Sequence, residues 1–545
     1  MRARSSAVFI TLLLAVHARP ASGQEPAACA PLPVHTAQLA EQLHADALTP
    51  ATAAGREPPA RRRWAGEARL SDRVVECGTG RDRFTLRILP LAMETRYNSA
   101  FPRPMNDGSF RPGRGALLGA TGGFSLSAWP FTLVVRPEFH HHQNSDFDIV
   151  ERSVPNHSPY IHHAVGTVID LPQRFGDQPF SVGHLGQTTL RADWRGVVGG
   201  VSTENLWWGP ALRNPLIMSS AAPGFPHAFI GSSRPVNIGI GHVHVRTLVG
   251  RLTESNFFDF DDDNDHTLIS GTVGTFEPAP LPGLVIGATR TFTLRQSDEV
   301  GYGTLLRSAF TDFRDNRTGA LADDQNVSVF ALWAFPRAGV EIYGEFGRLD
   351  HWWEWIELVT APQKSGAKMW GVQKRFGEER DGWRVLVEAV DLVDPFPLNG
   401  PVWQIVWYTH SGIRQGHTNQ GQLLGAPVGP GARSQVLAVD RFSEAYGYGI
   451  ELSRTLYNEE TYLNTWWPSY YIFGHDAELS GLLRGRVSRG EYDVQAAVGY
   501  SRRWNRNFLG LADVQSAWTP ADLRREDNTY VELRGVWRPQ WRLAR

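Results

Sequence analysis

Apolar and polar residues alternate with a period of two in many short runs after about residue 83. In one run, Phe131, Leu133 and Val135 alternate with Thr132 and Arg136. Runs of the same kind occupy residues 131–140, 190–195, 340–346, 383–389, 403–408, 492–501 and 531–537. Side chains alternate between the two faces of a strand, so each run predicts a strand with one apolar and one polar face.

Charged residues recur on the polar faces, and several apolar faces end in aromatic residues. This combination is typical of a transmembrane barrel, whose apolar faces meet lipid, whose aromatic residues form girdles and whose polar faces line the interior. We therefore predict an all-β fold: a large closed antiparallel transmembrane β-barrel over residues 83–545. A soluble propeller is the structural alternative, but no repeat of about 40 to 50 residues is visible.

The residues before the strands differ in character. Residues 1–23 have two early arginines, an apolar core and a small-residue end, which predicts a signal peptide. Residues 24–82 are predicted to be a short, mostly helical periplasmic segment. Within it, Thr36 to Leu48 has apolar residues four apart and predicts an amphipathic helix, and residues 61–77 form a second short helix or a basic connector.

Composition narrows the class of protein. The 545 residues include 19 tryptophans, and the net charge is −2. No apolar run of about 18 residues follows the N-terminus, so transmembrane helices are not expected. The near-neutral charge gives no support to nucleic-acid binding. Two cysteines in an exported chain predict a disulfide, between Cys29 and Cys77.

The stretch Thr203 to Pro235 interrupts the strand pattern with two adjacent tryptophans and several prolines. It is too long and too proline-broken for one strand or helix. Such a segment between strands is either a space-filling loop or a functional one.

Three stretches carry a resemblance to a known family. They are the WWGP-to-GFPH part of Thr203–Pro235, the run Tyr408 to Gln435 and the segment NDGSFRPGRG, Asn106 to Gly115. In order and spacing they resemble the Wzi-type capsule assembly family of outer-membrane proteins. The resemblance implies a barrel of about 18 strands, a helical periplasmic part and a lectin-like role in holding exported polysaccharide at the cell surface.

Candidate carbohydrate contacts follow from motif position and side-chain chemistry. Aromatic rings suit the apolar faces of sugars, and arginine forks pair with carboxylates. The predicted contacts are Trp207, Trp208, Arg213, Arg234, His351, Trp352, Trp353, Arg414 and Arg433. Two structural alternatives stay open: the tryptophans near His351 belong to an interface girdle, or the arginines pair with internal carboxylates.

Other clusters predict less. The acidic run Asp259 to Asp265 has oxygen ligands for calcium but fails the EF-hand pattern, so a solvated loop is favoured and calcium binding stays open. His140 to His142, with His162 and His163, are read as strand-end polar residues, because neighbouring strand residues point to opposite faces. No metal, cofactor or catalytic motif is recognised.

The sequence therefore predicts a non-enzymatic protein of a Gram-negative outer membrane, exported by its signal peptide and surrounded by lipid as a monomer. We expect it to bind capsular or extracellular polysaccharide through many weak contacts that add up along a polymer. A channel for small solutes or oligosaccharides is the alternative function, and a barrel enzyme acting on lipid or glycan is a third.

Overall fold

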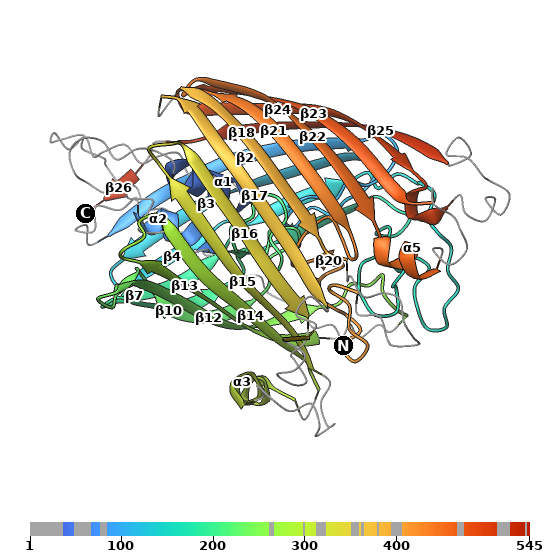
Figure 1. Cartoon of the computed structure of the whole chain (residues 1–545), viewed down its shortest axis with the longest axis horizontal. Coiled ribbons are helices and arrows are strands. Elements are labelled where there is room, and N and C mark those ends of the chain that lie inside the picture. Colours follow the sequence, from blue (N-terminus) through green and yellow to red (C-terminus); the bar gives the residue numbers. More distant parts are fainter. Residues whose placement is uncertain are drawn as a thin grey trace, which may run out of the picture.

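The strands close into a single antiparallel barrel (Figure 1). The computed structural model describes residues 36–47, 67–76, 84–260, 266–297, 300–311, 323–349, 359–360, 365–378, 381–393, 406–465, 474–509, 524–539 and 542–544. When segments that continue one another are joined, the barrel has 18 strands. For example, β4 and β5 pair with successive parts of β3 and form one interrupted strand.

The barrel segments follow the chain in order. They are β2 (Thr85–Asn98), β3 (Gly115–Ala128), β4 (Phe131–Val135), β5 (Glu138–His142), β6 (Phe180–His184), β7 (Thr189–Trp194), β8 (Val197–Ser202), β10 (His227–Ser232), β11 (Val236–Asn237), β12 (Gly241–Thr253), β13 (His266–Pro278), β14 (Leu284–Arg295), β15 (Asp323–Phe335), β16 (Val340–Leu349), β17 (Gly366–Gly377), β18 (Gly382–Asp391), β21 (Arg433–Phe442), β22 (Tyr446–Tyr457), β23 (Asp476–Arg489), β24 (Tyr492–Trp504), β25 (Arg525–Trp537) and β26 (Arg542–Ala544).

The predicted alternation is confirmed in the barrel wall. On β16, Glu341, Tyr343 and Glu345 are buried inside, while Ile342 between them is exposed on the outer face. On β24, Tyr492, Val494 and Val498 are exposed outside. One predicted strand is wrong: Trp407 and Tyr408 lie in a turn inside the barrel. Residues 403–405 of that run lie outside the described residues.

The two ends of the barrel differ. Short turns join the strands at one end, such as residues 195–196 between β7 and β8 and residues 336–339 between β15 and β16. Long segments join them at the other end, such as residues 99–114, 143–179 and 392–432. We call these the short-turn end and the long-loop end.

Exposed aromatic side chains gather near the short turns, as a girdle at a membrane interface requires. They include Trp129, Phe131, Trp194, Phe376, Trp383, Tyr446, Tyr492 and Trp537. Trp129 and Trp194 stack with ring centroids 5.1 Å apart.

The barrel closes where its last strands meet its first. Residues 91–98 of β2 pair with β25, and residues 85–87 pair with β26. The basic C-terminal tail thus contributes a short strand to the closing seam. Among the described helices, which are α1 (Thr36–Ala47), α2 (Leu70–Glu76), α3 (Tyr302–Thr311), α5 (Glu459–Thr465) and the single turn η3 (Arg506–Phe508), none is long and apolar enough to cross a membrane.

Candidate functional site

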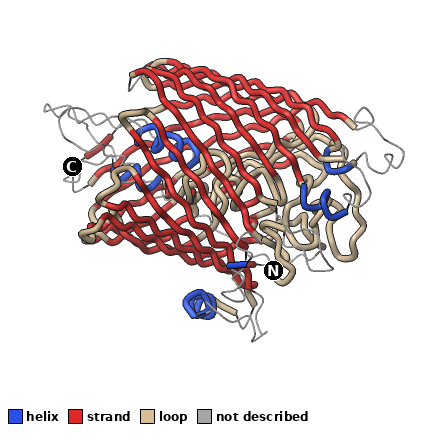
Figure 2. The backbone as a smooth tube through the Cα atoms, viewed as in Figure 1, coloured by secondary structure: helices blue, strands red, loops and turns tan. Residues whose placement is uncertain are grey.

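The lumen is filled by the segment 203–226, which joins β8 to β10 and which we call the plug segment. Figure 2 shows loop segments inside the barrel that the strands enclose. Trp207 and Trp208 form β9, pair with β1 (Glu67–Ala68) and are fully buried. The plug segment and the inward faces of the wall make one continuous hydrophobic core.

A second segment, residues 406–432, enters the lumen and interlocks with the plug segment. The Tyr408 hydroxyl donates to the carbonyl of Leu216 over 2.8 Å. The Ser219 backbone N–H donates to the carbonyl of Leu424 over 2.6 Å. Residues 418–419 and 422–423 form the small hairpin β19–β20 (Thr418–Asn419 and Gln422–Leu423). Two loops far apart in the sequence therefore occlude the lumen together, which argues against an open channel.

One wall carboxylate holds the plug segment in place. Glu388 of β18 accepts the backbone N–H groups of Leu212, Arg213 and Asn214 over 2.7, 3.0 and 3.0 Å. The hydroxyl of Tyr343 donates to the same carboxylate over 3.0 Å. Four donors on one buried carboxylate satisfy backbone groups that would otherwise be desolvated without partners.

Nearby, Gly209 has a φ of +87°, a conformation that favours glycine. A Cβ at this position would lie 2.7 Å from Oε2 of Glu345, so the plug backbone approaches the wall too closely for a side chain.

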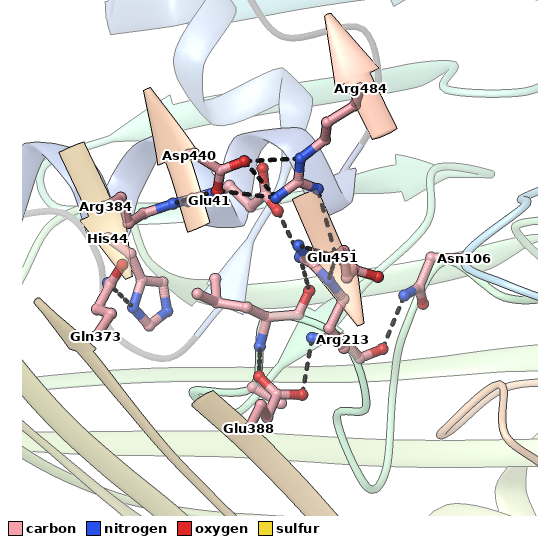
Figure 3. Close-up of polar contacts among 12 residues, drawn as sticks. Glu41, His44, Asn106, Arg213, Gln373, Arg384, Glu388, Asp440, Glu451 and Arg484 are labelled. Carbon is pink, nitrogen blue, oxygen red and sulfur yellow. Dashed lines mark hydrogen bonds and ion pairs between the residues drawn. The ribbon is translucent and has the colours of Figure 1, made fainter. Parts of the chain in front are cut away.

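Arg213 links three elements through ion pairs (Figure 3). Its guanidinium contacts Glu41 of α1 and Glu451 of β22. Glu451 also pairs with Arg484 at 3.3 Å, and Arg484 pairs with Asp440 at 2.7 Å. Because these charges are buried or half-buried, removal of one partner leaves others uncompensated.

The N-terminal elements are bound inside the barrel. His44 of α1 contacts Glu341 of the wall. Arg69, just before α2, contacts Glu204 at the start of the plug segment, and Arg246 of the wall pairs with Glu67 and Asp72 at 3.4 and 3.3 Å. Helices were predicted in this part of the chain and are present; the wider boundaries and the periplasmic location of residues 24–82 stay predictions.

Several predicted contact residues belong to this internal architecture. The indole N–H of Trp207 donates to Ala211 over 3.0 Å, and that of Trp208 donates to Glu67 over 3.4 Å. A sugar ring has no access to either tryptophan in this conformation. Arg213 is used in the buried ion pairs, and Arg433 pairs with Asp391 at 3.0 Å. For both arginines the structure has the alternative arrangement, pairing with internal carboxylates.

The other predicted residues lie apart. Arg234 is exposed in the β10–β11 turn at the short-turn end, and Arg414 is exposed in the segment 406–432. His351, Trp352 and Trp353 lie outside the described residues, as do Cys29 and Cys77. Of the acidic run, Asp259 and Phe260 are described and residues 261–265 are not. The described residues contain no cluster of metal-ligand type.

His140 to His142 end β5, whereas His162 and His163 lie in the segment 143–179, so the prediction that these two are strand-end residues is wrong. His140 and His142 both point inward, where Nδ1 of His140 lies 2.6 Å from Nε2 of His142, while His141 is exposed between them. His184 stacks on His140 with centroids 5.6 Å apart. Alternation thus gathers every second histidine on one face.

Two adjoining hollows lie at the long-loop end, on either side of the segment 99–114. The larger has a volume of about 160 Å³ and the smaller about 30 Å³; Asp107 and Pro112 line both. The larger hollow has aromatic walls from Phe101, Phe147 and Phe175, and polar edges that include Gln173, Gln422, Arg503 and Asn507. The charge of Arg503 is neutralised by Asp476, to which it donates two hydrogen bonds of 2.6 Å.

Three arginines line the smaller hollow and form no salt bridge with a carboxylate within the described part of the chain. The guanidinium of Arg111 lies over the rings of Phe175 and Phe180, with its carbon 5.0 and 5.5 Å from their centroids. That of Arg103 lies 4.2 Å from the ring centroid of Tyr530. Arg114 donates to the backbone carbonyls of Ser99 and Asp146. Burial lowers the pKa of Arg111 although Asp170 acts against it, whereas the pKa of Arg103 is raised, against the effect of its burial, by Tyr530 and by the carboxylates of Glu478, Glu451 and Glu532.

Sequence reasoning did not select these arginines. Arg111 and Arg114 belong to the segment NDGSFRPGRG, which entered only as a mark of resemblance. The sequence feature that could have identified them is the pair Arg111 and Arg114, separated by Pro112 and Gly113. Proline and glycine favour a turn, and a turn places both side chains at one loop surface.

His162 lies in the wall of the larger hollow and is neutral. Its Nδ1 accepts the backbone N–H groups of Ala164 and Val165, each over 3.2 Å. Burial, reinforced by Arg152 and Arg503, lowers the pKa of His162 to about 3. The neighbouring His163 is also buried, and its pKa lies well below the usual value. The hollow therefore keeps two uncharged imidazoles at neutral pH.

These features define a class of protein: an outer-membrane β-barrel whose lumen is occluded by its own loops. A family model described as capsule assembly protein Wzi matches residues 107–512. The chain belongs to this Wzi family of capsule assembly proteins.

The chain also matches solved structures, of which the Escherichia coli Wzi structure supports the barrel fold. The Escherichia coli Wzi structure, described as a carbohydrate-binding β-barrel involved in group 1 capsule assembly, matches with a TM-score of 0.53 and 13% identity, covering 85% of this chain and 87% of that chain. Acinetobacter baumannii OccAB2 matches with a TM-score of 0.40 and 9% identity, covering 83% and 98%. Pseudomonas aeruginosa OprD matches with a TM-score of 0.37 and 9% identity, covering 85% and 94%. Among curated proteins, none matches the chain.

Proposed function

We propose that this protein binds exported capsular or extracellular polysaccharide at the long-loop end and helps to attach it to the cell surface. The observation that carries the proposal is the group that Arg103, Arg111 and Arg114 form at the smaller hollow, the first two beside aromatic rings, over an occluded lumen. In outer-membrane barrels short turns face the periplasm and longer loops face outward. The long-loop end is therefore the end that meets surface polymer.

The chemistry of this surface favours acidic sugar residues. A guanidinium presents a planar fork of donors that matches a carboxylate, and an aromatic face beside it accepts the apolar side of a sugar ring. Membership of the Wzi family and the carbohydrate binding described for the Escherichia coli protein support the same function. The protein acts by binding, without a catalytic step, as a monomer in outer-membrane lipid.

Affinity for a polymer does not require one strong site. A single hollow of this size contacts only a short piece of a polymer, but a long chain presents many repeats to many barrels, so weak contacts retain it. This mode also allows Arg414, exposed at the same end, to contribute.

Binding of purified polysaccharide to the purified protein tests the proposal. The Arg111→Gln variant removes a charge whose described contacts are two aromatic rings, so the fold is expected to persist. The matched control is Arg234→Gln; Arg234 was also a predicted contact, but it is exposed at the short-turn end, away from the proposed surface. We expect the affinity for acidic polysaccharide to fall roughly tenfold for Arg111→Gln, as for loss of a charged hydrogen bond, and to stay unchanged for Arg234→Gln. Equal affinity in all three proteins would exclude this site.

A further inference from the structure

The outer face of the wall carries a hollow unrelated to the polysaccharide surface. It has a volume of about 750 Å³ and lies across β18, β21, β22, β23 and β24. Its outward-facing side chains are strongly exposed: Leu437 at 42%, Leu452 at 48%, Leu479 at 52% and Tyr500 at 48%. Four strand spacings of about 4.8 Å make it roughly 19 Å wide.

A glycine forms the floor of this groove. In the strand register, Val387, Leu437, Leu452, Gly481 and Tyr500 lie side by side in one row. Gly481 presents no side chain between Leu452 and Tyr500, so the row has a gap bounded by an apolar and an aromatic wall. A gap of this shape in a lipid-facing surface fits a hydrocarbon chain.

The next row, two residues closer to the long loops, is polar except for one leucine. It contains Gln435, Arg454, Leu479, Arg502 and Asp527 as successive register partners. Gln435, Arg454 and Arg502 lie within three residues of the long-loop ends of their strands. With the long loops outward, this row is at the headgroup level of the outer leaflet.

The two arginines of this row differ in whether a carboxylate neutralises them. Arg502 is neutralised by Asp527, with hydrogen bonds of 2.7 and 3.0 Å. Arg454 donates to the amide oxygen of Gln435 over 3.0 Å, and within the described part of the chain no carboxylate pairs with it. At the headgroup level a guanidinium can reach anionic groups of the lipid, so it does not need a partner within the protein. The surface thus combines an apolar groove with one uncompensated positive charge at its outer edge.

We propose that this groove is a binding site for a phosphorylated, acylated glycolipid of the outer leaflet. One acyl chain lies over Gly481 between Leu452 and Tyr500, and a phosphate of the headgroup pairs with Arg454. The pairing is charge-assisted and gives Arg454 an anionic partner. This site does not depend on polysaccharide binding, because none of its residues belongs to the two hollows at the loop surface.

Native mass spectrometry of the purified full-length protein, titrated with diphosphoryl lipid A, tests the site. We expect one saturable bound lipid for the wild type and at least about tenfold weaker binding for Arg454→Gln. Lipid A stripped of phosphate is expected to bind the wild type as weakly as diphosphoryl lipid A binds that variant.

Gly481→Leu tests the acyl groove separately. An added Cβ meets Leu452 Cδ2 at 3.6 Å, an ordinary contact, so the wall tolerates a side chain there. This variant is expected to lose binding of both lipids while keeping the wild-type circular dichroism spectrum. The matched control is Arg251→Gln, an exposed arginine near the long-loop end of β12, which is expected to bind like the wild type.

Three outcomes overturn the proposal. They are equal binding by Arg454→Gln and Arg251→Gln, equal binding of phosphorylated and phosphate-free lipid by the wild type, and a protein dimer that Gly481→Leu abolishes, since the occupant would then be a second copy.

Discussion

Replacing Glu388 by alanine is expected to release the plug segment without unfolding the barrel. The carboxylate accepts three backbone N–H groups of residues 212–214 and the hydroxyl of Tyr343. Each buried donor left without a partner costs about 1–3 kcal/mol, so the three backbone groups alone cost roughly 3–9 kcal/mol. That loss is comparable to the whole stability of many domains, which is about 5–15 kcal/mol.

The barrel itself keeps its strand pairing, because the backbone ladder of β18 with β17 and β21 does not involve the Glu388 side chain. Loss of the Glu388 hydrogen bonds therefore loosens the plug segment and opens the lumen. We expect the Glu388→Ala protein to show current steps in planar bilayers and faster proteolysis within residues 203–226, while the wild type stays closed and resistant.

Glu478→Ala is the matched control. Glu478 is a buried glutamate of β23 whose carboxylate accepts from Tyr457 of the adjacent strand over 2.8 Å, so it joins wall to wall. The reasoning is refuted if Glu388→Ala remains as closed and as protease-resistant as Glu478→Ala.

Three further predictions concern the packing, the ion pairs and the buried histidine described above. Gly271→Ala places a Cβ 2.7 Å from Cη2 of Trp208 and is expected to cost about 1–3 kcal/mol, seen as a lower thermal midpoint; an unchanged midpoint contradicts the packing. Arg213→Met leaves Glu41 and Glu451 without their shared partner and is expected to cost about 3–5 kcal/mol, read as faster hydrogen exchange in α1; unaltered exchange argues against the network. His162 has a pKa of about 3 in the folded state against about 6.5 unfolded, so its stabilisation is complete above pH 6.5 and is lost as the pH falls towards 3. At pH 5 the loss is about 2 kcal/mol, and proteolysis of residues 143–179 should accelerate there in the wild type but less in His162→Gln.

The wall was predictable because lipid imposes a simple rule on it. Phe131, Leu190 and Tyr492 face outward, as the alternation predicts, and Thr132, Arg191 and Asp493 face inward. A period of two survives wherever one face meets lipid and the other a polar interior. The helix predicted over residues 36–48 is also confirmed, as α1.

The lumen was not predictable by the same rule. Trp407 and Tyr408 fit the alternating pattern, but they lie in a turn and are buried inside the barrel. Aromatic residues that fill the lumen can be buried without belonging to a strand. Whether a tryptophan is a sugar contact or a plug anchor depends on which segments share the lumen. That sharing brings residue 216 to residue 408 and residue 213 to residue 451, and no local pattern encodes such distances.

The internal pairing of the arginines was not predictable for a related reason. Arg213 and Arg433 look like ligand-binding residues in sequence, yet the barrel supplies Glu451 and Asp391 as partners. Arg111 looks ordinary, yet folding leaves it over two aromatic rings and without a salt bridge to a carboxylate among the described residues. The partner, rather than the residue type, decides which guanidinium is available to a ligand.

Retention of surface polysaccharide tests the central claim most directly. Cells lacking this protein are complemented with the wild type, with Arg111→Gln or with Arg234→Gln, and cell-bound and released polymer are assayed separately. We expect total polymer to be equal throughout, with shedding into the medium in the deletion strain and in the Arg111→Gln strain, and normal retention in the other two. Unchanged cell-bound polymer in the deletion strain would contradict attachment as the function of this protein.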